Sequence, residues 1–508
     1  MAEMTGAQAM FEMMKREGVR YVFGNPGTTE LPLMDIFAAR DEIEYIMALH
    51  EDSALGMAAG YSEASGAPAV VNLHATPGLA HALGNLYNAH RAGTPLVVTA
   101  GQQDSRAMLD RPLLYADMLE IARQHTKWVW EVRHASEIPR VFARAFQISQ
   151  TPPTGPVFVS LPVDVMEERA ETVFPQVTHP GRRVRGDREK IEEAARLLSA
   201  AARPAIITGD GCARSKAVAE AVKLAEKLGA RVHSEPLNAL LTFPTSHPLF
   251  AGPLYPNARQ TRAQLEGVDV LLVIGAGNLA PLVYTGERMI PDGVRLIQID
   301  ADDRELGKNH PSEVAIAADP RSAIEELSRA LDGLGSDGPS GKAAALTGRE
   351  ARREMTTAAI ASARAKLVEA TGGEAEGVAL SPSTVAREMR AAAAPDAVLV
   401  DESVTSTAYV RTIFDLSEPG SYFYAKGGSL GLGLPMAVGV KLAMPGRQVL
   451  CAVGDGSALY SIQALWTAAR HGLGVTFIIF NNASYMILKG GLLALNGSSV
   501  ERGVFTGM

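Results

Sequence analysis

The most informative stretch of this chain for predicting its fold is VGDGSALYSIQALWTAARHGLGVTFIIFNN, residues 453–482. In it an apolar strand ends in Gly-Asp-Gly-Ser, an amphipathic helix follows, and a second apolar strand ends in Asn-Asn. Strands with little polar alternation that are separated by a helix are typical of parallel sheets buried on both faces. The stretch therefore predicts one strand–helix–strand unit. Both motifs should lie at the carboxyl ends of neighbouring strands, where the ligands of such sheets bind.

Similar units recur along the chain. The first strand of that stretch covers 448–456, and seven other apolar runs rich in Val and Ile, separated by helix-length segments, lie at 45–51, 69–75, 95–101, 157–162, 205–211, 270–277 and 295–301. Two polar, turn-rich seams cover 178–188 and 331–342. We predict an α/β protein with three open, mainly parallel-sheet domains over 1–180, 187–335 and 375–508. We expect the third to be incomplete, because the sequence ends soon after the Asn-Asn pair.

The composition narrows the class of protein. No apolar run approaches the roughly 20 residues of a membrane span, and the first residues lack the basic start and apolar core of a secretory signal. The only cysteines, Cys212 and Cys451, are too few for a disulfide framework and suit a reducing compartment. The net charge of -8 argues against a nucleic-acid partner. We therefore expect a cytoplasmic protein that binds neither membranes nor nucleic acid.

The two motifs of residues 453–482 could share one cation. Asp455 and Asn482 are one strand–helix–strand unit apart, so their side-chain oxygens can meet at the sheet edge. Two such oxygens, a backbone carbonyl and water suit Mg²⁺. Gly454 and Gly456 would let the backbone approach a phosphate, which the following helix N-terminus would face. Either motif alone fits a purely structural turn equally well. A second Gly-Asp-Gly, at 209–211, has no Asn-Asn pair downstream and is interpreted as such a turn.

Together the two motifs resemble the signature of thiamine-diphosphate enzymes, and the resemblance extends through nearly the whole chain. Segments in the order typical of thiamine-diphosphate decarboxylases and carboligases are GNPGTTELPLMDIF (24–37), HED (50–52), VNLHATPG (71–78) and TAGQQ (99–103). Within that family the chain is most similar to the benzoylformate decarboxylases, because it also has QALWTAA (463–469) and DES (401–403).

The resemblance implies how the cofactor is bound. The first domain would bind the aminopyrimidine and the third the diphosphate, with a nucleotide-fold-like domain between them. The site would form between two subunits, so the chain would be a homo-oligomer. Glu51 would hydrogen-bond the pyrimidine and promote formation of the ylide. Asp455, Asn482 and the carbonyl of Ser484 would bind Mg²⁺. The remaining cofactor contacts implied are Thr405, Gly428, Leu430, Gly456, Ser457 and Tyr485.

The resemblance also implies a reaction. His74 matches a histidine that moves protons to and from the enamine intermediate, and Thr28 stands where a hydroxyl binds the substrate carboxylate. The expected activity is non-oxidative decarboxylation of a benzoylformate-like 2-oxo acid to an aldehyde and CO₂. Three departures bear on it. Leu282 occupies the place of a second catalytic histidine, Met486 and Ile487 replace small pocket residues, and Lys426 replaces a neutral one.

Four other functions remain open. The missing second histidine favours carboligation of the acetolactate-synthase type. The G-x-G-x-x-A run at 275–280, with Asp300 at the end of the next strand, imitates a dinucleotide-binding fingerprint. That pattern would suit an NAD-dependent oxidoreductase, or FAD or ADP bound in the middle domain. The last alternative is a cofactor-binding subunit that has lost catalysis.

Overall fold

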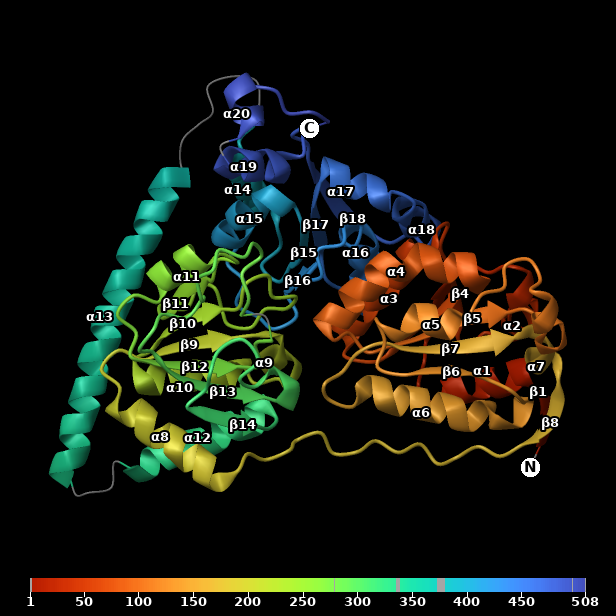
Figure 1. Cartoon of the computed structure of the whole chain (residues 1–508), viewed down its shortest axis with the longest axis horizontal. Coiled ribbons are helices and arrows are strands. Elements are labelled where there is room, and N and C mark those ends of the chain that lie inside the picture. The colour runs from red at the N-terminus through yellow and green to blue at the C-terminus, as the bar shows by residue number, and fades with distance from the viewer. Residues whose placement is uncertain (1, 278, 335–338, 372–379, 496, 508) are drawn as a thin grey trace. The chain divides into compact units, whose positions relative to one another are not determined.

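A computed structural model describes residues 2–277, 279–334, 339–371, 380–495 and 497–507 (Figure 1). The chain forms three parallel-sheet α/β domains. By its internal contacts it divides into two compact units. Unit 1 contains 1–180, 393–407 and 425–508, and unit 2 contains 181–392 and 408–424. The expected domain boundaries at 335 and 375 lie outside the described residues.

The N-terminal sheet has six parallel strands in the order β3-β2-β4-β5-β7-β6. Its strands are β2 (Tyr21–Gly24), β3 (Glu44–Met47), β4 (Ala69–Leu73), β5 (Leu96–Gln102), β6 (Val129–Glu131) and β7 (Val157–Pro162). The major helices around it are α1 (Gly6–Arg16), α2 (Leu31–Ala39), α3 (Glu51–Ser65), α4 (Ala75–Ala92), α5 (Met118–Arg123), α6 (Ile138–Gln150) and α7 (Val163–Glu167). A short antiparallel pair, β1 (Ala2–Thr5) and β8 (Arg169–Thr172), lies beside them.

Burial of both sheet faces explains this layering. Every residue of β4, β5 and β7 is buried, as their unbroken apolar runs predict. Helices α1 and α6 pack on one face through Phe11, Phe142 and Phe146, while α3 and α4 lie on the other (Figure 1).

The central sheet has six strands in the order β11-β10-β9-β12-β13-β14, all parallel. Its strands are β9 (Ala205–Thr208), β10 (Arg231–Ser234), β11 (Phe250–Pro253), β12 (Val270–Ile274), β13 (Arg295–Asp300) and β14 (Val314–Ala317). The helices of this part of the chain are α8 (Arg188–Ala200), α9 (Asp210–Arg214), α10 (Val218–Leu228), α11 (Ala258–Gln264), α12 (Pro320–Leu334) and α13 (Pro339–Thr371). Helix α12 runs into the second expected seam, so that seam does not begin at residue 331.

The C-terminal sheet contains β15 (Val398–Glu402), β17 (Val449–Gly454) and β18 (Val475–Phe480), which are parallel. Strand β16 (Tyr422–Tyr424) belongs to unit 2, where its Phe423 forms an antiparallel bridge with Leu240. The remaining helices are α14 (Pro382–Ala392), α15 (Thr407–Ile413), α16 (Gly433–Ala443), α17 (Asp455–Tyr460), α18 (Ala464–Arg470), α19 (Met486–Leu495) and α20 (Ser498–Arg502). All nine strands expected from the apolar runs are therefore confirmed.

Within unit 1, α3 and α16 pack backbone to backbone. A Cβ atom at Gly60 would clash with the carbonyl oxygen of Met436, and one at Gly439 would clash with that of Met57. Only glycine permits such an approach. The packing brings the start of α3 close to the loop that precedes α16.

Candidate active site

Three polar segments follow neighbouring strands of the C-terminal sheet. Glu402 at the end of β15 is paired with Val453 of β17, and Gly454 is paired with Phe480 of β18. Thr405, Asp455 and Asn482 follow these positions by one to three residues. The register therefore places these three residues after the carboxyl ends of three neighbouring strands.

The Gly-Asp-Gly-Ser turn is open around its carboxylate. No described residue hydrogen-bonds to the Asp455 side chain, which is half-buried, while Ser457 is buried at the start of α17. The ring of Tyr485 approaches Gly456, where a Cβ atom would lie 3.5 Å from it. The turn is thus flanked by a ring from the segment that follows β18.

The expected metal ligands form a set of oxygen donors. The backbone N–H of Ser484 donates to Oδ1 of Asn482 at 3.0 Å, which folds the Asn-Asn segment into a tight turn. The hydroxyl of Ser484 is buried without a hydrogen-bond partner among the described residues. A carboxylate, an amide oxygen and a carbonyl are ligands that suit Mg²⁺. This donor chemistry fits the metal that the sequence predicts.

A buried carboxyl group shapes the loop that carries Gly428 and Leu430. Glu402 accepts the backbone N–H groups of Gly431, Leu432 and Gly433. Burial raises the pKa of Glu402 to about 7, although these hydrogen bonds lower it. Gly428 is exposed at φ +89°, a backbone conformation that favours glycine. No role for Glu402 was predicted from the sequence, although it lies within the DES segment.

The side chain of Asn88 on α4 holds the other half of this loop. Its amide donates to the carbonyl of Ser429 at 2.8 Å, and its Oδ1 accepts the backbone N–H of Ser429 at 3.1 Å. A Cβ atom at Gly427 would clash with Asn88. The loop of the third sheet is thus fixed by a helix of the first.

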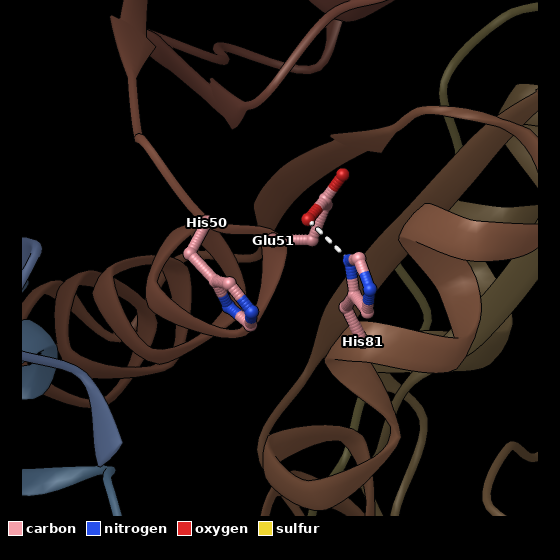
Figure 2. A group of neighbouring side chains, drawn as sticks. All are labelled: His50, Glu51 and His81. Atoms are coloured by element: carbon pink, nitrogen blue, oxygen red, sulfur yellow. Dashed lines mark hydrogen bonds and ion pairs between the residues drawn. The ribbon is translucent and has the colours of Figure 1, made fainter. Parts of the chain in front are cut away.

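Glu51 begins α3 directly after His50, whose Nδ1 accepts the backbone N–H of Asp52. The Glu51 carboxylate is buried and lies 3.0 Å from Nδ1 of His81 on α4. Figure 2 shows His50, Glu51 and His81 gathered together. One nitrogen or oxygen atom from each of the three lies within 4.8 Å of the other two. Burial raises the pKa of the neighbouring Asp52 to about 7. The sequence did not single out His81, although a helix places it two turns after His74 and on the same face.

His74 stands just before α4 and pairs with a carboxylate that the sequence did not single out. Its Nδ1 lies 2.8 Å from Oε2 of Glu30 and 3.3 Å from Oγ1 of Thr29. Glu30 is buried and also accepts hydrogen bonds from Thr29 and from the backbone N–H groups of Gly27 and Gly101. An ionised carboxylate accepts only, so Nδ1 carries the proton and Nε2 is left for other chemistry.

Several other predicted positions are exposed. Thr28 is exposed at the start of a short turn over Thr28–Glu30, whereas the buried Thr29 contacts His74. Leu282 is 74% exposed in unit 2. Met486 and Ile487 are exposed at the start of α19. Lys426 is half-buried.

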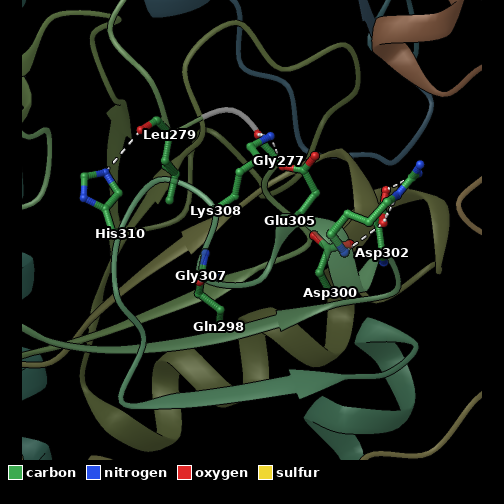
Figure 3. A network of polar contacts seen from close by, with 10 residues as sticks. Gly277, Leu279, Gln298, Asp300, Asp302, Glu305, Gly307, Lys308 and His310 are labelled. Atoms are coloured by element: carbon green, nitrogen blue, oxygen red, sulfur yellow. Dashed lines mark hydrogen bonds and ion pairs between the residues drawn. The ribbon is translucent and has the colours of Figure 1, made fainter.

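In unit 2, the side chains of Glu305 and Lys308 lie against Gly277 of the dinucleotide-like run (Figure 3). A Cβ atom at Gly277 would lie 3.2 Å from the carboxylate of Glu305, which pairs with Lys308. Asp300 accepts the backbone N–H of Asp302, and burial raises its pKa to about 7. A phosphate at this turn would meet the Glu305 carboxylate, so the geometry disfavours a dinucleotide here.

Comparison with known proteins identifies the family. The models of the thiamine pyrophosphate enzyme N-terminal, central and C-terminal domains match residues 4–122, 191–327 and 403–503. The chain is 34% identical to benzoylformate decarboxylase of Pseudomonas aeruginosa, over 95% of this chain and 86% of that protein. It is 28% identical to the acetolactate synthase large subunit of Haemophilus influenzae, over 95% of this chain and 83% of that protein. A solved 4-hydroxybenzoylformate decarboxylase of Rhodococcus jostii superposes with a TM-score of 0.84 at 32% identity, over 99% and 90% of the two chains.

The chain therefore belongs to the thiamine pyrophosphate enzyme family. It is a thiamine-diphosphate-dependent enzyme, and its relatives are consistent with a carboxy-lyase. Among the described residues, no helix is long and apolar enough to cross a membrane.

Proposed function

We propose that this enzyme uses thiamine diphosphate and Mg²⁺ to decarboxylate a benzoylformate-like 2-oxo acid without oxidation, releasing an aldehyde and CO₂. The observation that carries the proposal is the pair of His74 with the buried Glu30 carboxylate, which lies at the same end of α4 as Glu51. The likeness to benzoylformate decarboxylases supports the choice of substrate class.

The cofactor would be held by residues of unit 1. Asp455, Asn482 and the Ser484 carbonyl would hold Mg²⁺. When bound, thiamine diphosphate supplies a nucleophilic carbon that adds to the 2-oxo group and takes up the electron pair released with CO₂. The residues that would contact its diphosphate or pyrimidine are Thr405, Gly428, Leu430, Gly456, Ser457 and Tyr485.

Two acid–base groups would move protons in this site. The carboxyl of Glu51 would hold the proton shared with the pyrimidine nitrogen, a role suited to its buried position. Nε2 of His74 would transfer protons at the reacting carbon, because Glu30 fixes the proton on Nδ1. The hydroxyl of Thr28 would bind the substrate carboxylate.

Carboligation of the acetolactate-synthase type is the second candidate. Leu282 cannot carry a proton, and the described segment around it, 279–293, contains no histidine. Slower protonation would leave time for a second carbonyl compound to react. The identity to acetolactate synthases is lower than that to benzoylformate decarboxylase.

We also propose the assembly and location of the enzyme. Self-association would complete the site at a subunit interface, and the three domains would cover 1–180, 187–335 and 375–508. Both cysteines, Cys212 and Cys451, are buried and free, which suits the cytoplasm.

Product analysis tests the proposal. The enzyme would be incubated with benzoylformate or pyruvate, with and without thiamine diphosphate and Mg²⁺. We expect cofactor-dependent benzaldehyde and an equal amount of CO₂ from benzoylformate. CO₂ without matching aldehyde would instead establish carboligation, and inactivity with both acids despite bound cofactor would refute the substrate class.

A further inference from the structure

The Glu51 carboxyl group has one hydrogen-bond partner among the described residues, and that partner is His81. The two side chains come from different helices, since Glu51 is the first residue of α3 and His81 lies in the second turn of α4. Oε2 of Glu51 and Nδ1 of His81 are 3.0 Å apart (Figure 2). On the other side, Oε1 of Glu51 faces the backbone of α4, 3.2 Å from where a Cβ atom of Gly78 would lie.

The pair lies between a buried group and the surface of the single chain. In the single chain the Glu51 side chain is 8% exposed, whereas that of His81 is 53% exposed. A buried carboxyl that must gain or lose protons needs a path to water, and an imidazole with one nitrogen on the carboxyl and the other toward solvent can provide it. His81 places Nδ1 on the carboxyl, and about half of its side chain is exposed.

The neighbouring histidine restricts the ring of His81. The rings of His50 and His81 stack at 5.1 Å between centroids and 24° between planes. Nδ1 of His50 accepts the backbone N–H of Asp52 at 3.2 Å, so the His50 proton lies on Nε2 and its ring is neutral. A neutral ring can stack on His81 without charge repulsion.

Among the described residues, Tyr45 on β3 and Asp52 on α3 are further titratable groups near Glu51. Burial raises the pKa of Tyr45 well above its ordinary range and that of Asp52 to about 7. Asp52 is engaged by the backbone and side chain of Asn85. Tyr45 holds its proton at neutral pH, so His81 is the group best placed to exchange protons with Glu51.

We propose that His81 is a positioning residue that orients the Glu51 carboxylate through Nδ1–H and relays protons between that carboxylate and solvent. The Nδ1–H bond breaks as an O–H bond forms on Glu51, and Nε2 takes a proton from water or a buffer acid, so the charge of the imidazole is unchanged. The inference rests on the proposed role of Glu51.

The first test needs no cofactor. In protein carrying ¹⁵N-labelled histidine at about pH 8, where an ordinary imidazole is neutral, long-range NMR correlations report the tautomer of each ring. The His81 signals are assigned by their loss in His81→Gln. We expect the Nδ1–H tautomer, and its conversion to a mixture in Glu51→Ala. An Nε2–H tautomer in the unaltered protein would overturn the proposal.

The second test measures deuterium exchange at the reactive carbon of thiamine diphosphate bound to the holoenzyme. We expect His81→Ala to slow exchange about 10-fold or more. This factor is smaller than the one that a group acting directly as acid or base usually contributes. Added imidazole should restore much of the rate in His81→Ala but none in Glu51→Gln. His81→Gln keeps a donor for orientation but cannot relay protons, so its rate should also fall. The exposed His134→Ala serves as the matched control.

The outcomes separate the relay from the role of Glu51. If Glu51→Gln slows exchange at least 100-fold while both His81 variants match the control, the relay is refuted and the role of Glu51 stands. If Glu51→Gln leaves exchange unchanged, the proposed role of Glu51 fails first.

Discussion

The same tripeptide, Gly-Asp-Gly, ends a parallel strand in two sheets of this enzyme, and the two copies differ in what surrounds the aspartate. In the central sheet the Asp210 carboxylate is buried and accepts the backbone N–H groups of Ala239 and Leu240. In the C-terminal sheet Asp455 is half-buried, and no described residue hydrogen-bonds to its carboxylate. The first carboxylate supports a loop, whereas the second is available to a cation. The difference arises because the loop that follows strand β10 binds the first carboxylate, whereas no described residue binds the second.

The glycines of the two copies give the largest expected difference in stability. A Cβ atom at Gly209 would clash with the carbonyl oxygen of Gly275, whereas the nearest atom to one at Gly454 would be Oγ of Ser457 at 3.6 Å. We expect Gly209→Ala to lower the free energy of unfolding by about 3 kcal/mol or more, because backbone cannot move aside. Gly454→Ala should change it by less than about 1 kcal/mol. Urea unfolding measures both, and equal losses would contradict the comparison.

A pH effect of up to about 3 kcal/mol follows from the raised pKa of Glu402, which is displaced from 4.5 to about 7. Between these values the folded protein binds more protons than the unfolded chain. This contribution to stability is therefore complete below about pH 4.5 and is lost as the pH rises to about 7. Glu402→Gln should flatten that part of the pH profile of unfolding. A profile as steep as that of the unaltered protein would refute the assignment.

A smaller loss of stability is expected when Asp210, in the Gly-Asp-Gly copy of the central sheet, is replaced. Asp210→Asn keeps one oxygen acceptor and loses the other, so one of the two backbone N–H groups becomes unpaired. We expect a loss of about 1–2 kcal/mol in the free energy of unfolding. Thermal unfolding of the variant measures it, with the exposed Asp110→Asn as a control. A variant as stable as the control would mean that Asp210 does not support the loop.

Short-range patterns in the sequence predicted much of this structure. Unbroken Val and Ile runs identified the strands, because strands buried on both faces require apolar residues throughout. One strand–helix–strand unit was enough to place Asp455 and Asn482 at neighbouring strand ends. Both inferences depend on residues close together in the sequence.

Contacts between distant segments could not be predicted. Glu30 and His74 are 44 residues apart, and Asn88 and Ser429 are 341 apart. Such pairs form only after the helices have packed. The close approach of α3 to α16 requires glycines at the contact, and a single sequence does not show which glycines serve this purpose. Buried partners such as Glu30 and Glu402 were missed for this reason.

We propose that only the second Gly-Asp-Gly turn binds the metal–diphosphate part of the cofactor. Calorimetric titration of thiamine diphosphate in the presence of Mg²⁺ tests it directly, with the unaltered protein, Asp455→Ala and Asp210→Asn compared at one temperature. We predict that Asp455→Ala weakens binding by at least about 100-fold, which is about 2.7 kcal/mol, and that Asp210→Asn leaves it unchanged. Unchanged affinity in Asp455→Ala would contradict the account.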